Sequence, residues 1–339
     1  MNDVMAWLRS TGTHWWYDSA VLSAMPGAVG DGCEGVTTNP LLLRRALTGH
    51  PQEYRGLVGP AQAGETADDR VVGFMRAVLG RIAERLRPTY EASGGRVGYV
   101  CAQVNPHWAG DDAAMLAMAE RVHTWAPNIA VKLPATAAGL RVMEACVGLG
   151  IPTVITIGFS VAQSLAVGRR YEAALAAHRP DAPAPCFSVL MVGRLNEFLR
   201  DVAADHGPAV SEADIGQAGV AVTLRIAELY AERGYTAAVL ASGFRAVSQV
   251  TALVDRGIHL SIGPEILADL KAAASVPGGT TPDGALERLM AMPEFRQAYD
   301  EDGLAEGGFI GFGPVQRTLA QFEFDGWQGI ASHLDESPQ

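Results

Sequence analysis

The segment NIAVKLPATAAGL, residues 128–140, places a lysine inside an apolar run. Lysine is among the residues that proteins most rarely bury, and this chain has only two, Lys132 and Lys271. Burial would lower the pKa of Lys132, and a neutral amine can attack a carbonyl to form a Schiff base. The alternative is an ion pair with an acid on a neighbouring strand, such as Asp18.

Polar residues at the ends of other apolar runs could complete this chemistry. Asp18 could take a proton from the hydroxyl beside a breaking carbon–carbon bond, or it could cap a helix or form an ion pair. Thr156 and Gln103 could hold the water that adds to and leaves an imine carbon, or they could be ordinary polar groups of the fold. Asn39 could bind substrate hydroxyls, or cap a helix that begins at Pro40.

A further group of residues is suited to binding a phosphate. Arg194, Ser242 and Arg245 lie at or just after the ends of two apolar runs, and two guanidinium groups with a hydroxyl suit a phosphate dianion. Each arginine taken alone could equally form a surface ion pair. Thr38 and Ser188, which also lie at or near strand ends, are candidate substrate ligands as well. The histidines show neither HxH nor HExxH spacing, so no metal site is predicted.

The scaffold for these residues is indicated by eight short apolar runs, each followed by a helical pattern. Several runs are apolar on both faces, which is typical of a parallel sheet covered by helices. We predict strands at 14–18, 34–39, 96–104, 128–135, 152–159, 185–192, 237–243 and 258–263. This alternation predicts a (β/α)₈ TIM barrel, in which the carboxyl ends of the strands carry the chemistry. An open doubly wound sheet is the alternative, but no glycine-rich loop follows the first strand.

Periodicity and helix-end signals predict the segments between the strands. Helices are expected at 66–87 (ending before Pro88), 111–124, 137–149, 160–178, 194–206, 211–233, 246–256 and 264–275. Residues 49–65 and 275–282 are rich in glycine and proline and are predicted to be loops. We expect residues 1–339 to form a single barrel domain, with residues 280–339 as a helical C-terminal extension packed on it.

Composition excludes several classes of partner. The net charge of −11 argues against nucleic acid or an anionic membrane surface, although local arginines could still bind one phosphate. The four cysteines have no metal-type spacing, and most of them lie in apolar stretches. With no secretory leader pattern and no apolar run of membrane-spanning length, the sequence predicts a cytoplasmic protein. Whether it forms a homodimer stays open at this stage.

Taken in order, the motifs resemble those of the transaldolase family over about residues 15–270. The segment NIAVKLPATAAGL is similar to the family's lysine signature, and GVTTNPLLL (35–43) is similar to its motif after the second strand. Three further segments match in the same order: GIPTVITIGFSVAQ (150–163), VGRLNEFLRD (192–201) and ASGFRAVSQV (241–250). The lysine signature and GVTTNPLLL together are specific for the family, whereas either motif alone is less specific.

The resemblance implies a (β/α)₈ barrel that needs no cofactor. It implies transfer of dihydroxyacetone, a three-carbon ketol unit, between sugar phosphates, as in the pentose phosphate pathway or in a specialised branch of carbohydrate metabolism. Carried over by motif, the implied roles are Schiff-base formation by Lys132, proton transfer by Asp18, donor binding by Asn39, water binding by Thr156, and phosphate binding by Arg194, Ser242 and Arg245.

The sequence departs from the family pattern at several site positions. Gln103 stands where transaldolases have a glutamate, and glutamine there resembles the fructose 6-phosphate aldolases. Val189 and Met191 replace the serine and the aromatic residue of the family's sixth strand, and Gly243 is an extra residue after Ser242. Two alternatives follow. One is an aldolase that releases free dihydroxyacetone, and the other is a catalytically silent protein that binds sugar phosphates.

Overall fold

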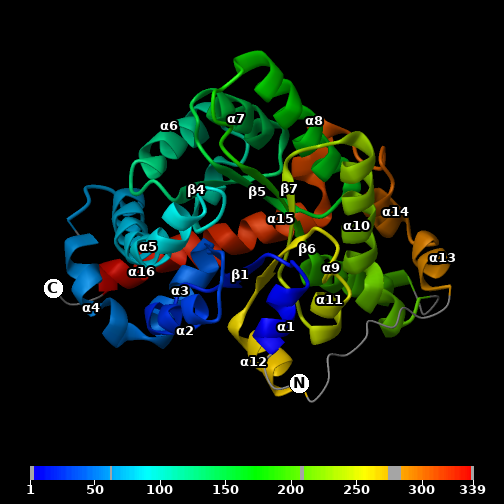
Figure 1. Ribbon diagram of the computed structural model, residues 1–339, viewed down its shortest axis with the longest axis horizontal. Helices are drawn as coiled ribbons and strands as arrows, with labels where there is room; N and C mark the ends of the chain where they lie inside the picture. The colour runs from blue at the N-terminus through cyan, green and yellow to red at the C-terminus, as the bar shows by residue number, and fades with distance from the viewer. Residues whose placement is uncertain (1–3, 62, 207–209, 274–283, 337–339) are drawn as a thin grey trace.

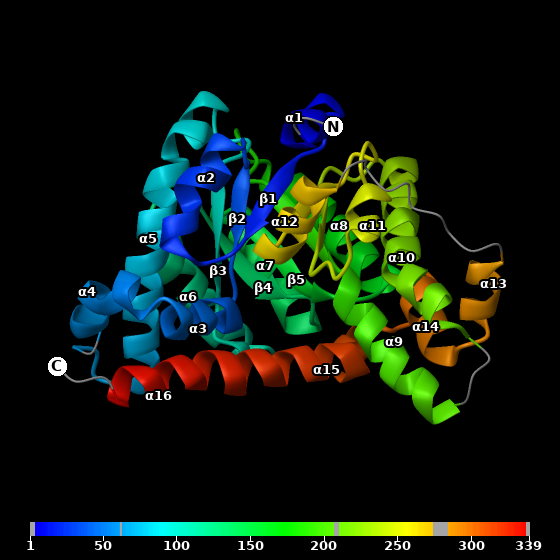
Figure 2. The same cartoon turned by 90° about the horizontal axis from the view of Figure 1, so that it is seen from below.

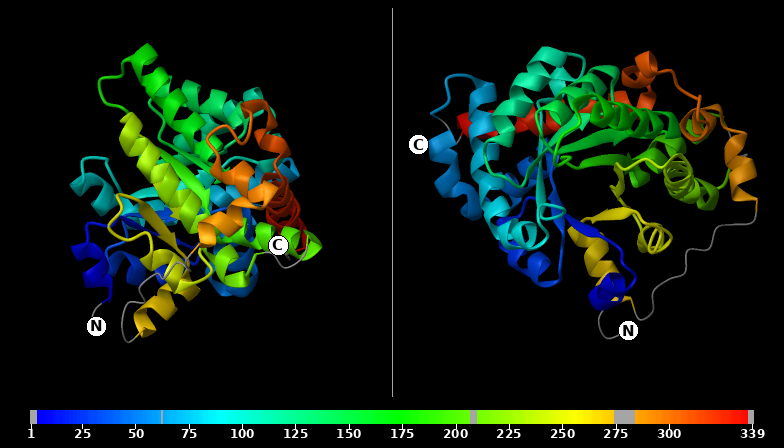
Figure 3. Two further views of the ribbon diagram at one scale, coloured as in Figure 1. Left: turned by 90° about the vertical axis from the view of Figure 1, so that its right-hand side faces the viewer. Right: turned by 45° about the horizontal axis from the view of Figure 1, so that its top comes forward.

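The architecture is a closed barrel of eight parallel strands in chain order, as the sequence predicts. A computed structural model describes residues 4–61, 63–206, 210–273 and 284–336. The strands are ringed by helices, which lie on the outside of the barrel (Figures 1 and 3). They are β1 (Trp15–Asp18), β2 (Gly35–Thr37), β3 (Tyr99–Gln103), β4 (Ile129–Pro134), β5 (Thr153–Gly158), β6 (Cys186–Met191), β7 (Ala238–Ser242) and β8 (His259–Ile262).

Aromatic side chains fill the amino end of the barrel. The ring of Phe187 lies 4.8 Å from that of Trp16, 5.5 Å from that of His259 and 6.3 Å from that of Tyr99. At Gly35 a Cβ atom would lie 2.5 Å from the Trp16 ring, so only glycine leaves room for it. Because this end is packed with rings, polar chemistry is confined to the carboxyl ends of the strands.

The helices between the strands begin at side-chain caps of the expected kind. Thr136, Ser160 and Ser211 each accept a hydrogen bond from a backbone N–H in the first turn of the helix that follows. The helices up to β8 are α1 (Val4–Ser10), α2 (Met25–Gly30), α3 (Pro40–Gly49), α4 (Pro51–Ala61), α5 (Ala67–Ala92), α6 (Asp112–His123), α7 (Ala137–Gly148), α8 (Val161–His178), α9 (Val192–His206), α10 (Glu212–Arg233) and α11 (Val247–Thr251). After β8 follows α12 (Pro264–Ala272), and the short 3₁₀ helices η1 (Leu22–Ala24) and η2 (Pro106–Trp108) complete this part.

Three sequence expectations about helices were wrong, and one of them is the helix expected at 246–256, which spans only Val247–Thr251. Residues 49–65 are not a continuous loop, because α4 buries Tyr54, Leu57 and Val58 at helical spacing despite its glycines. Helix α5 continues past Pro88 to Ala92. Proline removes one hydrogen bond from a helix, and here that loss falls near an exposed helix end, where packing of the long apolar face outweighs it.

After β8 and α12, the chain forms further helices outside the barrel. These are α13 (Ala285–Met290), α14 (Pro293–Tyr299), η3 (Glu306–Gly311), α15 (Gly313–Ala320), η4 (Gln321–Gln328, a π-helix) and α16 (Gly329–Glu336). Figure 2 shows the α15–η4–α16 stretch as one long rod along one side of the barrel. It packs against α3, α5 and α9. The expected start of this extension at residue 280, and the expected loop at 275–282, lie outside the described residues.

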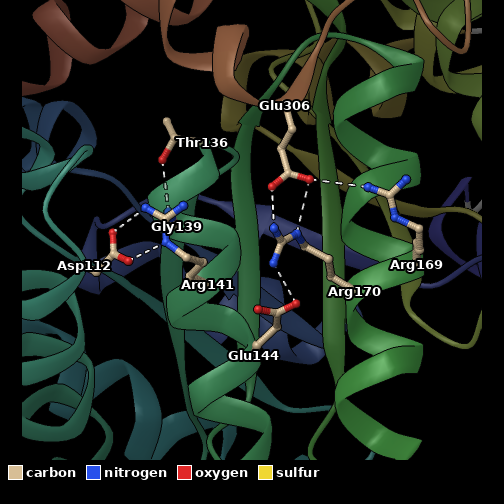
Figure 4. A network of polar contacts seen from close by, with 8 residues as sticks. All are labelled: Asp112, Thr136, Gly139, Arg141, Glu144, Arg169, Arg170 and Glu306. Atoms are coloured by element: carbon tan, nitrogen blue, oxygen red, sulfur yellow. Dashed lines mark hydrogen bonds and ion pairs between the residues drawn. The ribbon is translucent and has the colours of Figure 1, made fainter.

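Ion pairs connect η3 to the helices around the barrel (Figure 4). Glu306 of η3 accepts hydrogen bonds from Arg169 at 3.4 Å and from Arg170 at 3.2 Å, both on α8. Arg170 also donates to Glu144 of α7 at 2.7 Å. The network therefore joins the C-terminal helices to the barrel.

In the described part of the chain, no helix is both long and apolar enough to cross a membrane.

Candidate active site

A pocket of about 70 Å³ lies at the carboxyl end of the barrel. Strands β1, β2, β4, β6 and β7 and the first turns of α3 and α9 contribute to it. Its walls are formed by Asp18, Thr37, Asn39, Leu41, Leu42, Arg45, Lys132, Val189, Met191, Arg194, Ser242, Gly243 and Arg245. Six residues expected from the sequence therefore meet in one pocket: Asp18, Asn39, Lys132, Arg194, Ser242 and Arg245.

Lys132 is buried, with 5% of its surface exposed, and its Nζ donates a hydrogen bond to the Thr38 carbonyl at 3.0 Å. Burial lowers the pKa of Lys132, the charge of Arg194 lowers it further, and Cys101 and Asp18 oppose the shift. Among the described residues, no carboxylate forms an ion pair with Nζ. The structure therefore favours an amine that is readily deprotonated over the ion-paired alternative.

Asp18 lies at the end of β1 beside a short chain of hydroxyl groups. Thr37 Oγ1 donates to Asp18 Oδ1 at 2.6 Å, and Ser261 Oγ lies within hydrogen-bond distance of the same threonine oxygen. Because a threonine has one O–H group, Ser261 is the donor in the second bond. Burial raises the pKa of Asp18, while Lys132 and the bond from Thr37 partly offset the rise. A carboxylate with a raised pKa is a better proton acceptor than an exposed one.

Gln103 and Thr156 lie on the two strands that flank β4. Gln103 pairs with Lys132, and Thr156 pairs with Pro134, so both side chains point to the barrel interior, as Lys132 does. Gln103 Oε1 and Thr156 Oγ1 are buried and have no hydrogen-bond partner among the described residues. Buried polar atoms usually have a partner, so these two are suited to holding a small polar ligand or water beside the lysine.

Arg194 is held by the C-terminal helical rod. Its Nη1 donates to Gln321 Oε1 at 2.6 Å, and its guanidinium carbon lies 5.2 Å from the centre of the Phe322 ring. Burial and the nearby charge of Arg245 lower the pKa of Arg194 to about 10. The sequence analysis missed Gln321 and Phe322, because both lie in η4, more than 120 residues after Arg194 and outside the recognised motifs.

Arg245 lies at the rim of the pocket rather than inside it. About half of its side chain is exposed, and its Nε donates to Glu197 Oε1 at 2.6 Å. Its Nη1 also donates to the Gly243 carbonyl at 3.1 Å. Gly243 has a φ of +68°, a conformation that favours glycine and turns the chain just after Ser242. The turn at this extra glycine therefore determines where the backbone of Arg245 lies relative to the pocket.

Four predicted site residues do not line the pocket, namely Gln103, Thr156, Thr38 and Ser188, and Asn39 has a second role. The Thr38 hydroxyl donates to the Cys101 carbonyl at 2.7 Å, so Thr38 serves the site through its own carbonyl, which accepts from Lys132. Ser188 faces outward from β6 toward Tyr230 of α10. Asn39 lines the pocket and also caps α3, because its Oδ1 accepts from the Leu42 N–H at 2.9 Å.

A larger pocket of about 350 Å³ adjoins the first and leads outward. The two share Asp18, Leu42, Arg45, Gly243 and Arg245. Arg45 was also missed by the sequence analysis, although helical spacing after Asn39 places it on the same face of α3 as Leu41 and Leu42. The described residues contain no group of three or more His, Cys, Asp or Glu side chains that could hold a metal ion.

Comparison with known proteins identifies the family. Residues 15–307 match the model of the Transaldolase/Fructose-6-phosphate aldolase family. The chain belongs to this family. Among its curated relatives, Transaldolase 1 of Streptomyces avermitilis is 33% identical over 205 residues, which is 58% of this chain and 54% of the relative. Transaldolase 1 of Streptomyces coelicolor is 37% identical over 144 residues, covering 42% of this chain and 38% of the relative.

A third relative is more distant and matches over more of its length. The transaldolase of Thiobacillus denitrificans is 28% identical over 284 residues, which is 80% of this chain and 79% of the relative. The chain thus spans about half or less of the length of the two Streptomyces proteins, and most of the Thiobacillus one.

Proposed function

We propose that this protein is a transferase of the transaldolase type, which moves a three-carbon ketol unit between phosphorylated sugars through a Schiff base on Lys132. The observation that carries the proposal is the buried Lys132 amine, with its lowered pKa, facing a pocket that also contains Asp18 and Arg194. The lysine imine itself accepts the electrons of the breaking bond, so the proposed reaction requires no cofactor.

In the proposed cycle, Lys132 Nζ attacks the ketone carbon of the donor, and water leaves as the imine forms. Asp18 then takes the proton of a hydroxyl group on the carbon that lies two bonds from the imine carbon. The carbon–carbon bond beside that hydroxyl breaks, its electron pair moves into the iminium to give an enamine, and an aldehyde departs. An acceptor aldehyde enters, the enamine carbon attacks it, and Asp18 returns the proton.

The remaining candidate residues, in the pocket or beside it in the barrel interior, are assigned to water and phosphate. Gln103 and Thr156 would hold the water that hydrolyses the imine, since both have a buried oxygen without a partner among the described residues. Arg194, Ser242 and Arg245 would bind the phosphate. Because Arg194 and Arg245 lie just after β6 and β7, two of the five strands that line the pocket, a phosphorylated ketose would lie with its carbonyl toward β4 and its phosphate toward the loops after β6 and β7.

The test is reductive trapping with sodium cyanoborohydride and a panel of ketose phosphates, read by intact-protein and peptide mass spectrometry. We expect one adduct, on Lys132, and its complete loss in Lys132→Ala. Lys271→Ala is the matched control, because Lys271 is the other lysine of the chain and lies on α12 in an ion pair with Asp31. An unmodified Lys132 would refute the proposal, and would favour the silent sugar-phosphate-binding alternative if the ketose phosphates still bind.

The second candidate is a lyase that releases free dihydroxyacetone. Gln103 favours it, because an amide can position water but cannot take its proton, so the steps that hydrolyse the imine differ from those of a glutamate enzyme. Turnover of a ketose phosphate without an added aldehyde acceptor separates the two. A transferase stalls under this condition, whereas a lyase continues to form product.

A further inference from the structure

One cationic side chain of the site, Arg45 of α3, has no partner among the described residues. The three other cationic groups that line the inner pocket of about 70 Å³ each donate a hydrogen bond to the protein. The Arg45 guanidinium forms neither a hydrogen bond nor an ion pair with any residue that the structure describes, although it lines both this pocket and the outer pocket of about 350 Å³. Arg45 is therefore available to bind an anionic ligand where the two pockets join.

Helix α3 leads from the inner pocket to the outer one. Asn39 caps the helix and lines the inner pocket, whereas Leu42 and Arg45 follow it at helical spacing and line both pockets. Ala46, on the same face of the helix, lines the outer pocket. A group that extends from Asn39 along this face therefore passes Leu42 and reaches Arg45.

A ketose bound for the proposed reaction has two ends. When its carbonyl carbon is at Lys132, its phosphate end lies toward Arg194 and Ser242, on the side of β6 and β7. Carbon 1, on the other side of the carbonyl, then lies toward Asn39, the proposed donor ligand. Because the inner pocket is small and the outer pocket is several times larger, a bulky substituent on carbon 1 would lie in the outer pocket, beside Arg45.

The loops that form the outer pocket suit a phosphate. Residues Gly243–Arg245 follow β7, residues Gly263–Ile266 follow β8, and both segments line the pocket. In barrel enzymes the loops after the seventh and eighth strands frequently form a phosphate site. Since the Nε of Arg245 is occupied by Glu197, Arg45 is the guanidinium of this pocket that keeps its donors available.

The charges around Arg45 also favour a bound anion. Two carboxylates, Asp18 and Glu265, line the outer pocket, and neither forms an ion pair with Arg45. After burial and the charge of Arg245, the charge of Arg45 further lowers the pKa of Arg194, so the guanidinium groups repel one another across the joined pockets. A phosphate dianion beside Arg45 would accept charge-assisted hydrogen bonds and reduce this repulsion.

We infer that the outer pocket binds a second phosphate through Arg45, and that the preferred substrate is a ketose bisphosphate, with one phosphate on carbon 1 and one on its last carbon. This inference rests on the proposed function and names the substrate class for it. The transferred ketol unit then carries the phosphate of carbon 1. The reaction keeps its balance: imine formation releases one water, and bond cleavage transfers one proton to Asp18.

The experiment compares fructose 6-phosphate with fructose 1,6-bisphosphate in cyanoborohydride trapping on Lys132, and intact mass gives the sugar concentration that half-saturates adduct formation. A hydrogen bond to a charged group contributes about 1.5 kcal/mol or more, so we expect this concentration to be about ten-fold lower for the bisphosphate. Arg45→Gln should bring the ratio of the two concentrations close to one. Arg55→Gln is the matched control, because it also removes one positive charge, and Arg55 is an exposed residue of α4 outside the pocket linings, so the ratio should stay at the wild-type value.

Each outcome has a distinct meaning. Equal half-saturating concentrations for the two sugars in the wild-type protein, or a preference that persists in Arg45→Gln, would overturn this inference and leave the proposed function intact. An equal loss of affinity for both sugars in Arg45→Gln would also overturn it, because Arg45 would then bind the phosphate that the two sugars share. No adduct on Lys132 with either sugar would overturn the proposed function itself. If Arg45→Gln does not fold, the wild-type ratio still decides the question.

Discussion

At the scale of single residues, the charge on Asp18 depends on Thr37. Burial raises the pKa of Asp18, whereas the hydrogen bond from Thr37 stabilises the carboxylate and limits that rise. Ser261 in turn donates to Thr37 and fixes the direction in which the threonine hydroxyl points. Lys132 and the hydrogen bond from Thr37 therefore both limit the rise in the pKa of the proposed base.

Replacing Thr37 should move the pH dependence of turnover. If Asp18 must be ionised to take the substrate proton, the rate falls as pH drops through its pKa. Thr37→Val removes a bond that favours the charged form, so the pKa rises and the acid limb of the kcat/KM profile shifts to higher pH. Thr37→Ser keeps a hydroxyl and should restore the wild-type profile. Superimposable profiles for wild type and Thr37→Val would show that Asp18 is not the titrating base.

At the scale of elements, the alternation of apolar runs and helical patterns was enough to predict all eight strands and the barrel. Strand alternation also predicts which residues share the barrel interior, and Lys132 and Asp18 meet there for this reason. Ser188 shows the limit of strand-end reasoning, because one step along a strand reverses the face. Gln321 and Phe322 could not be predicted, because only the packing of η4 brings them to Arg194.

That packing predicts a role for η4 in phosphate binding. Gln321→Ala removes one hydrogen bond from the Arg194 guanidinium, which also packs against the Phe322 ring. A bond to a charged group contributes about 1.5 kcal/mol, so we expect KM for a ketose phosphate to rise about ten-fold. Trapping of a donor without phosphate should keep its wild-type rate, because Lys132 is untouched.

Gln316→Ala is the matched control for this experiment. Gln316 lies on the preceding helix α15 and is exposed, so KM should stay at the wild-type value. A rise in KM of equal size for both variants would show a general effect of the C-terminal rod. A loss of donor trapping in Gln321→Ala would show that the residue supports the barrel rather than Arg194.

At the scale of the whole molecule, the C-terminal helices are fastened to the barrel at several points around it. Arg288 of α13 donates to both carboxylate oxygens of Asp214 on α10, at 2.9 and 2.6 Å. The Trp327 indole of η4 donates to Asp68 of α5 at 2.7 Å. Because η4 also contacts Arg194, the bonds that attach η4 to the barrel also help to fix the position of Arg194 in the pocket.

Asp214 is the buried member of these contacts, and its removal should destabilise the protein in a pH-dependent way. It caps α10 with Ser211 and pairs with Arg288, and these bonds hold its pKa below the usual value. Because the pKa of Asp214 is lower in the folded than in the unfolded protein, its ionised carboxylate contributes its full stabilisation above the unfolded-state pKa of about 3.9. This stabilisation is lost progressively as the pH falls below that value. Asp214→Asn should therefore reduce the free energy of unfolding by about 2 kcal/mol at pH 7 and by less at pH 3.

Urea unfolding followed by circular dichroism at both pH values measures this difference. Asp201→Asn is the control, because Asp201 pairs with Arg317 between two largely exposed side chains and should contribute no more than about 0.5 kcal/mol at pH 7. A deficit for Asp214→Asn that persists unchanged at pH 3 would mean that packing, not the charge of Asp214, is responsible. A pH-dependent deficit that exceeds that of Asp201→Asn would instead identify the bond between α10 and α13 as the electrostatic anchor of the C-terminal helices.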